Sequence, residues 1–409
     1  MRFKNNKGIT LVALVITIII LLILAGISIM SLTNTGIFGK AQDAKTKSAE
    51  AETNQKATLD EYETELNKYG AGTNGGNQGQ GGGTSTGGNQ GQGGGTSTIG
   101  DSTVNQVIST SENKEIADAK GNKIVIPAGF KIVKTGTNYE NTANNEITVD
   151  KGIVVEDATG TATNGSQFVW IPVGTITKAD GSTTSVNLNR YTLDGTPTKQ
   201  NDEVINCYGS DFQELESSEK RNIVAKNIAN FKSSVTTNGG FYIGRYEART
   251  ATPRSSEDDT LTQITENGEE SVYNYVTQIQ AAQLARGMYD DTHPFTSDLV
   301  NSYAWDTATL FLQNCGKENY SRKASVNDSL ASKGTNASDY TGTRDNPCNV
   351  YDMASNAYEW TTETSSFYSA PCVGRGGSCF NSGFFTSFRY SGYTSSSFDY
   401  TGFRPLLYL

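Results

Sequence analysis

The sequence predicts an α+β fold for most of this protein, preceded by a membrane-spanning helix and a flexible linker. Three observations support this prediction. An uncharged apolar run lies near the amino terminus, and a Gly-rich segment repeated in tandem follows it. From about Gly121 onward, short β-type runs alternate with clusters of Gly, Asn, Thr and Asp, and a few stretches with helical spacing interrupt them. This last region predicts one loop-rich domain.

Composition and charge exclude several classes of function. The 409 residues hold 33 Lys and Arg against 43 Asp and Glu, a net charge of −10, whereas nucleic-acid binders carry a basic stripe that displaces counterions from phosphates. His293 is the only histidine, which excludes a His-rich zinc site, and its Asp-Thr-His-Pro setting predicts a solvated loop. The five cysteines are dispersed without a CxxC motif, which excludes a zinc knuckle and a thioredoxin-type site.

Residues 9–30 form the predicted membrane helix. The run Ile9–Met30 has 22 uncharged residues, enough to cross a hydrocarbon core about 30 Å thick. Arg2, Lys4 and Lys7 precede it and no charge follows until Lys40, so the positive-inside rule predicts a single-pass protein of the cell membrane with a cytoplasmic amino terminus and an extracellular carboxy-terminal domain. A cleaved secretory signal is the alternative, although its apolar stretch would be shorter and would end in a small-x-small site.

The run Lys7-Gly8-Ile9-Thr10-Leu11-Val12 and the apolar helix after it resemble a type IV prepilin amino terminus. The resemblance implies a leader of residues 1–8, cleavage between Gly8 and Ile9 by a prepilin peptidase, and methylation of the new terminal residue. The sequence departs from the family at Ala13, where a glutamate usually helps subunits to register during fibre assembly. This departure disfavours incorporation into a long pilus.

A stalk and a linker are predicted between the apolar helix and the outer domain. The stalk is residues 31–70, of which residues 40–68 read as a solvated helix with one weakly apolar side made of Leu59, Tyr62 and Leu66. A monomeric spacer helix is favoured over a coiled coil, since three apolar contacts do not sustain a seam. The linker is residues 71–100, in which GGNQGQGGGTST occurs twice in succession, and as a random coil it spans roughly 30 Å.

Residues 101–409 form the predicted outer domain, and its elements follow from hydrophobic spacing. Four runs predict strands: Lys123–Pro127, Gly152–Val155, Phe168–Val173 and Gly240–Tyr246. Three stretches predict helices: Glu214–Phe231, Gln278–Met288 and Asp298–Asn314. The last helix is expected to begin with Thr296 or Ser297 as its N-cap.

Five segments carry a second resemblance, namely QFVWIPV at 167–173, GFYIGRYE at 240–247, NVYDMASNAYEWT at 349–361, GRGGS at 374–378 and GFRP at 402–405. In this order they are similar to the formylglycine-generating, or sulfatase-modifying factor, domain. The resemblance covers most of residues 124–409 and implies a variant of the C-type lectin fold. A shared fold does not by itself imply a shared activity.

The enzymes of that family use two cysteines, at the third and eighth positions after the Gly-Gly-Ser, to bind copper and oxidise a substrate cysteine. In this sequence those positions are Asn381 and Thr386, and Cys379 lies outside the spacing. Neither cysteine is replaced by another soft donor. We therefore expect no copper, no catalytic residues and no enzymatic activity.

Two carboxylates stand where the family supplies calcium oxygens. They are Asp352 and Glu359, and the resemblance adds the backbone carbonyls of Ser355 and Ala357. Carboxylates and carbonyls suit a hard cation such as calcium in a structural role, although two carboxylates are few for a tight site. The alternative is that Asp352 caps a turn while Glu359 pairs with a buried arginine such as Arg375 or Arg404, and the sequence leaves both interpretations open.

Residues 378–400, called the window from here on, have an unusual composition. Eight of these 23 residues are aromatic and seven are Ser, whereas Leu, Ile, Val and Met are absent. A core segment would mix aromatic with aliphatic residues at a period of 2 or 3.6, which the window does not do. Rings interspersed with small polar residues are typical of antibody paratopes, where stiff rings supply contact area. The window therefore predicts a binding surface.

The window also falls where proteins diversified by retroelements carry variable residues on this fold. There, mutation of adenines turns asparagine codons into Tyr, Ser, Phe, Asp, Gly, Cys or Thr, the residue types found here. The predicted variable, ligand-binding residues are Cys379, Phe380, Phe384, Phe385, Phe388, Tyr390, Tyr393, Ser397, Phe398 and Tyr400. The predicted fixed frame is Gly376, Gly377, Arg389, Gly402 and Arg404. A lectin-type segment with fixed aromatic packing is the alternative.

These observations predict a membrane-anchored, pilin-like surface protein that binds a protein or glycan ligand, but no nucleic acid, through the window. Two alternative functions remain. One is a structural minor pilin or pseudopilin, whose head would bind nothing. The other is an oxidase of the formylglycine-generating type, which the residues at 381 and 386 disfavour.

Overall fold

In the computed structural model the described residues are 97–100, 103–134, 147–192, 198–200, 205–207, 210–214, 227–323, 345–367, 369–380 and 384–409. All of them belong to one of the two units into which the chain divides, Gln92–Leu409. The predicted leader, apolar helix and stalk lie outside the described residues, as does most of the predicted linker. The end of that linker is described: Ser97–Thr98 is strand β1, which pairs in parallel with β2 (Lys114–Ala117).

The first large sheet has six antiparallel strands. Their spatial order is β16 (Thr296–Leu299), β21 (Pro405–Tyr408), β13 (Gly240–Gly244), β6 (Gln167–Pro172), β5 (Val154–Asp157) and β4 (Phe130–Ile132). The two middle strands are continuous apolar runs, as expected for strands covered on both faces. A side chain at Gly240 would place its Cβ 2.4 Å from the ring of Trp170, so glycine is required where β13 begins beside β6.

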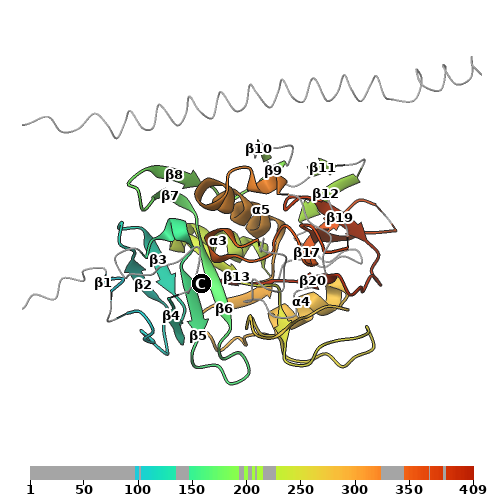
Figure 1. The fold of residues 1–409 in the computed structure, drawn as a ribbon, viewed down its shortest axis with the longest axis horizontal. Helices are drawn as coiled ribbons and strands as arrows, with labels where there is room; N and C mark the ends of the chain where they lie inside the picture. Colours follow the sequence, from blue (N-terminus) through green and yellow to red (C-terminus); the bar gives the residue numbers. More distant parts are fainter. Residues whose placement is uncertain are drawn as a thin grey trace, which may run out of the picture. The chain divides into compact units, whose positions relative to one another are not determined.

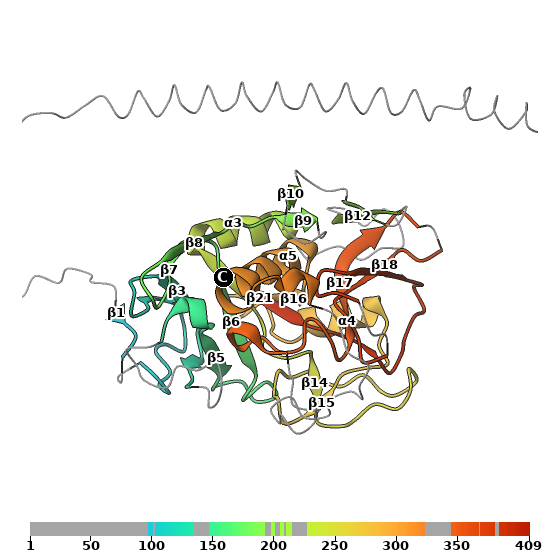
Figure 2. The same cartoon turned by 45° about the horizontal axis from the view of Figure 1, so that its top comes forward.

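The second large sheet carries the window. Its strand order is β11 (Ile205–Cys207), β12 (Ser210–Glu214), β17 (Tyr358–Ser365), β18 (Cys372–Arg375) and β19 (Arg389–Gly392), and β20 (Thr401–Phe403) pairs in parallel with β17. Figures 1 and 2 show the two large sheets side by side within this unit. Strand β17 is buried along its whole length, so it forms the centre of the second sheet.

The remaining strands form smaller sheets. One sheet joins β1 and β2 to β3 (Lys123–Ile126), and three antiparallel pairs are β7 (Gly174–Thr177) with β8 (Thr183–Val186), β9 (Arg190–Thr192) with β10 (Thr198–Gln200), and β14 (Arg249–Thr250) with β15 (Ser271–Val272). Short helical turns are η2 (Val149–Lys151), η3 (Leu312–Gly316), η4 (Tyr320–Arg322) and η6 (Pro347–Asn349).

Three α-helices are described, and each has a side-chain cap. Helix α3 (Ile228–Asn238) is capped by Asn227, α4 (Gln278–Arg286) by Thr277 in a reciprocal capping box with Gln280, and α5 (Ser302–Phe311) by Asn301. Helix α3 packs on β13 and β21, α4 on β16 and β17, and α5 on β6 and β17. Helices α4 and α5 therefore contact both large sheets and hold them together.

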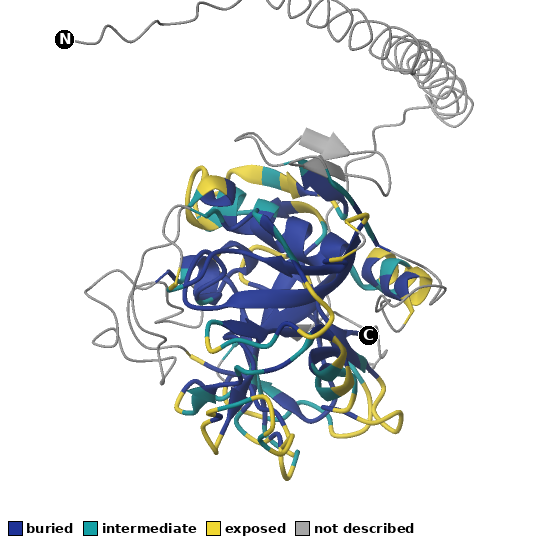
Figure 3. Ribbon diagram, turned by 90° about the vertical axis from the view of Figure 1, so that its right-hand side faces the viewer, coloured by how far each residue is buried: buried dark blue, intermediate teal, exposed yellow. Residues whose placement is uncertain are grey.

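The interior between these elements is well filled. Trp170, Trp305 and Trp360 are almost completely buried and belong to one continuous apolar cluster. Figure 3 shows the buried residues through the middle of this unit and the exposed ones in the loops at its periphery. A core of this kind holds the edges of the sheets rigidly, including the strands next to the window.

The predicted fold class is wrong in its balance of elements. The described residues are rich in strands, and the three α-helices have at most 11 residues. No described helix is long and apolar enough to cross a membrane, against the predicted transmembrane helix and single-pass membrane location. The apolar segment on which those two predictions rested lies outside the described residues, and neither prediction is retained.

Individual elements agree better with the sequence. Three of the four predicted strands are confirmed as β3, β6 and β13, and the predicted helix Gln278–Met288 is confirmed as α4. The fourth predicted strand, Gly152–Val155, is shifted, because Gly152 caps η2 and β5 covers Val154–Asp157. The predicted helix Asp298–Asn314 is wrong at its start, because Thr296–Leu299 pairs with β21 and the helix begins only at Ser302. Similarly, Glu214 ends strand β12 rather than beginning a helix.

Candidate functional site

The window connects three strands of the second large sheet. The chain leaves β18 at Arg375, forms β19 within the window and enters β20 at Thr401 (Figure 1, red). The ten predicted ligand-binding residues all keep part of their surface exposed, most of all Phe380 at 61% and Tyr393 at 58%. The five predicted frame residues are all buried. Exposure therefore separates the two predicted sets completely.

Three partly exposed rings of the window stack in a row. The ring of Tyr400 stacks on the rings of both Phe398 and Phe380. The ring centroids of Tyr400 and Phe398 are 5.1 Å apart and their planes differ by 4°. For Tyr400 and Phe380 the centroid distance is 4.6 Å and the angle between the planes is 11°. Aromatic pairs of this kind contribute about 0.5–1.5 kcal/mol beyond the area they bury. The stack therefore holds three rings in one orientation before any ligand arrives, which lowers the entropy cost of binding.

A buried tyrosine ties this stack to the rest of the window. Tyr358, at the start of β17, is 1% exposed. Its ring meets that of Tyr400 at 6.2 Å in an edge-to-face arrangement and stacks on that of Tyr390 at 5.1 Å and 10°. Its amide also donates to the carbonyl of Tyr400. The surface rings consequently rest on a fixed aromatic support.

The other window residues surround this aromatic group. Phe384 packs on Phe388 with ring centroids 4.2 Å apart, and the guanidinium of Arg322 lies 5.8 Å from the ring of Phe385. A turn closed by two hydrogen bonds between Tyr393 and Ser396 presents the exposed Tyr393 ring. Together these residues form a surface that is rich in aromatic carbon and poor in charge.

Buried ion pairs hold the window from beneath. Arg389, between Phe388 and Tyr390, directs Nη2 to Asp306 Oδ2 and Nε to Glu363 Oε1, each at 2.8 Å. Arg375 contacts the same two carboxylates at 2.5 and 3.1 Å, and Arg190 also binds Glu363. All five side chains are fully buried. Removing one partner from such a network leaves a buried charge uncompensated, so the network specifies one geometry for β19.

The electrostatics of this network favour its ionised form. Burial by itself would raise the pKa of Glu363, but the guanidiniums of Arg389, Arg190 and Arg375 outweigh it and lower that pKa to about 2. Burial also opposes the charge of Arg389, yet Asp306 and Glu363 raise its pKa above the usual arginine range. Both shifts favour the charged forms of Glu363 and Arg389 at physiological pH.

Hydrogen bonds to the window backbone complete the support. Arg375 Nε donates to the carbonyl of Phe388 at 3.1 Å, and Trp305 Nε1 donates to the carbonyl of Thr386 at 2.9 Å. The amides of Thr386 and Ser387 donate to the carbonyls of Lys323 and Ser321. Because these contacts use backbone atoms, they do not depend on which side chains the window presents.

Of the predicted calcium residues, Glu359 forms a buried ion pair with Arg404. Glu359 Oε1 and Oε2 accept from Arg404 Nη2 and Nε at 2.5 and 3.0 Å, so both carboxylate oxygens face a guanidinium. Asp352 begins a turn closed by the amide of Ser355. A cation at this place would meet the charge of Arg404, and no group of three acidic, His or Cys side chains able to hold a metal occurs among the described residues. The pairing of Glu359 with a buried arginine, which was the alternative to a calcium site, fits this geometry.

The other predicted positions are only partly described. Gly8, Ile9 and Asn381 lie outside the described residues. Thr386 is buried, and its hydroxyl makes no hydrogen bond within the described part of the chain. The four cysteines with described side chains, Cys315, Cys348, Cys372 and Cys379, are not joined in disulfides.

Two residues of the site were missed from the sequence, one buried and one exposed. Tyr358 lies in the segment 349–361 that carried the family resemblance, so it was not considered as a support for the exposed rings. Phe367 is 54% exposed and lies in the connection between β17 and β18. Cys372, at the start of β18, pairs with Gly392, at the end of β19. The connection that holds Phe367 therefore lies at the same end of the sheet as Tyr393, which follows Gly392. The setting of Phe367, Ser365-Ser366-Phe367, has the same Ser and aromatic composition as the window, a signal that could have identified it.

Comparisons with known proteins add no assignment, since no protein-family model and no curated protein matches this chain.

Proposed function

We propose that this domain is a binding module rather than an enzyme, and that the window binds a protein or glycan ligand without covalent chemistry. The observation that carries the proposal is the division described above. Every predicted contact residue keeps exposed surface, whereas every predicted frame residue is buried and the frame arginines are ion-paired. Rigid, partly exposed rings are the residues that dominate binding energy at protein interfaces.

The proposal is tested by selection on the immobilised full-length protein with two probes, a random peptide library displayed on phage and a printed glycan array. We expect at least one probe to yield binders. Replacement of Phe385, Tyr390 and Tyr393 by Ala should abolish their binding, because hot-spot rings each contribute about 2 kcal/mol or more. The thermal unfolding curve of the variant shows whether the domain stays folded.

A matched control separates loss of the site from loss of an exposed apolar group. Ile279 on α4 is 43% exposed and lies outside the window, so Ile279→Ala should leave binding unchanged. Binders that attach equally well to the folded triple variant would refute the window as the binding surface.

We also propose that the ten contact positions vary between copies of this protein. Support comes from the residue types, which all arise from asparagine codons by adenine mutation, and from the partial exposure of all ten side chains. Sequencing of the neighbouring DNA tests this. A reverse transcriptase gene and a near-copy of the window differing at adenines are expected, and their absence would refute diversification.

A further inference from the structure

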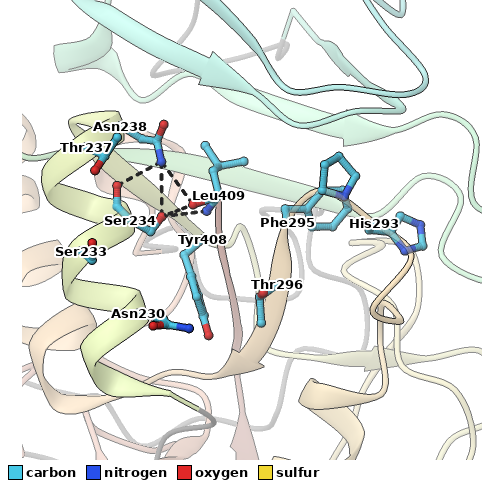
Figure 4. Close-up of a pocket in the computed structure, with 11 residues that line it drawn as sticks. Asn230, Ser233, Ser234, Thr237, Asn238, His293, Phe295, Thr296, Tyr408 and Leu409 are labelled. Atoms are coloured by element: carbon cyan, nitrogen blue, oxygen red, sulfur yellow. Dashed lines mark hydrogen bonds between the residues drawn. The ribbon is translucent and has the colours of Figure 1, made fainter.

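A pocket lined by residues outside the window lies between helix α3 and the loop that precedes β16. It has a volume of about 420 Å³, which is within the range of small-molecule sites. Figure 4 shows α3 on one side, His293 and Phe295 on the other, and Tyr408 and Leu409 between them. Its lining includes no Lys, Arg, Asp or Glu.

Helix α3 presents a polar stripe to this pocket. Asn230, Ser233 and Thr237 line it at a spacing of three and four residues, which places them on one helix face. Next to them, Ser234 and Asn238 already bind the main chain of Leu409. The side chains of Asn230, Ser233 and Thr237 make no hydrogen bond to other described residues. Each of them can both donate and accept a hydrogen bond.

The opposite wall is fixed in place. His293 Nδ1 lies 2.9 Å from Asp290 Oδ1, and its ring packs against those of Tyr289 and Phe295 at 5.4 and 5.1 Å. Asn113 Nδ2 donates to the carbonyl of Pro294 at 2.6 Å and so anchors the same loop. Asp290 engages Nδ1, which leaves Nε2 of the imidazole for a ligand.

The chemistry of the lining selects a class of ligand. Amides and hydroxyls that donate and accept at once match sugar hydroxyls, which do the same. Organic acids and phosphates would have to lose hydration without gaining a Lys or Arg partner from the lining, a cost that neutral ligands avoid. Phe295 and Tyr408 also line the pocket, and the carbon of their rings suits the C–H face of a sugar ring.

We infer that this pocket is a second binding site, independent of the window, for a single uncharged sugar residue. Binding is read out directly by NMR, because His293 is the only histidine of the chain and its imidazole C–H proton signals are therefore assigned without ambiguity. Methyl glycosides of glucose, galactose, mannose and N-acetylglucosamine are titrated into the full-length protein up to about 20 mM, a range that detects millimolar dissociation constants.

At least one neutral glycoside should shift the His293 signal saturably, whereas glucuronate and glucose 6-phosphate should not. Asn230→Ala and Thr237→Ala should each weaken that binding roughly fivefold, the loss of one hydrogen bond. Both positions are exposed on a helix, where alanine is favourable, so the variants are expected to fold. Maltotriose, a short chain of glucose residues, distinguishes a site for free sugars from a site for the end of a glycan. A site that is open to chains binds both maltotriose and the methyl glycoside, whereas a site for free sugars binds only the methyl glycoside.

Two controls make the test decisive. Thr236 neighbours Thr237 but does not line the pocket, so Thr236→Ala should bind as the unchanged protein does. The triple window variant should also retain the His293 shift, which separates failure of this inference from failure of the proposed function. The inference is overturned if no neutral glycoside shifts the signal, if the charged probes shift it equally, or if Thr237→Ala binds as tightly as Thr236→Ala.

Discussion

Phe388, Arg389 and Tyr390 are consecutive residues with opposite surroundings. The two rings keep exposed surface, while the guanidinium between them is fully buried against Asp306 and Glu363. Alternation along a strand explains how adjacent side chains reach opposite faces. A single strand therefore combines surface residues with the charge that fixes its position.

Replacing Arg389 by Met should lower the free energy of unfolding by about 3–5 kcal/mol, because Asp306 and Glu363 would each lose a buried partner. Urea denaturation measures the change. Arg322→Met, at an exposed arginine near the same window, serves as the control and should cost less than about 0.5 kcal/mol. Equal losses in the two variants would show that the buried network does not stabilise β19.

Glu214 makes stability depend on pH. Burial raises its pKa to about 7, against hydrogen bonds from Ser302 and Thr362 that lower it. Because the folded state then binds the proton more tightly than the unfolded state, this contribution is complete below about pH 4.5 and is lost as pH rises through about 7. Its full size is roughly 3 kcal/mol.

Glu214→Gln should remove that dependence while preserving the hydrogen bond from the Ser302 amide. Chemical denaturation between pH 4.5 and 8 should therefore show a smaller loss of stability in the variant than in the unchanged protein. Parallel curves for the two proteins would contradict the assignment of Glu214 as the titrating group.

At the scale of elements, local signals predicted what local interactions determine. The helical spacing of residues 278–288 predicted α4, and continuous apolar runs predicted the central strands. The start of α5 could not be predicted in this way, because Thr296–Leu299 is drawn into the sheet by β21, which lies more than a hundred residues later. The support that Tyr358 provides likewise depends on a parallel pairing with β20 that no local pattern records.

Gly376, just after β18, is required by two physical effects that can be separated. Its φ of +81° is strained for other residues, and a Cβ there would lie 2.4 Å from the carbonyl oxygen of Met353. Gly165 has the same φ of +81°, but a Cβ added there would have no neighbouring atom within 4 Å. We expect Gly165→Ala to cost about 1 kcal/mol and Gly376→Ala clearly more, since only the latter also displaces backbone. Thermal unfolding compares the two, and equal costs would show that the contact with Met353 is unimportant.

At the scale of the molecule, the two large sheets and their helices form a core that does not use the exposed rings. The apolar cluster contains Trp360 and Phe403 from the second sheet, whereas of the window residues that the structure describes only Tyr390 packs against it. Tyr390 is thus the one contact position at which surface and core meet. The sequence could predict this division from composition, because the window lacks aliphatic residues, but not which ring touches the core.

This division predicts that substitution of the exposed rings leaves the free energy of unfolding nearly unchanged, whereas substitution in the core lowers it. Phe380→Ser combined with Tyr393→Ser removes the two most exposed rings of the window and should change the free energy of unfolding by less than about 1 kcal/mol. Trp360→Ala, which opens a cavity beneath Tyr390 and removes the hydrogen bond from Nε1 to the carbonyl of Val276, should cost about 3–5 kcal/mol. Urea denaturation of both variants tests the difference. A large loss in the double variant would mean that the exposed rings are structural, and the fixed-packing alternative for the window would then replace the binding surface.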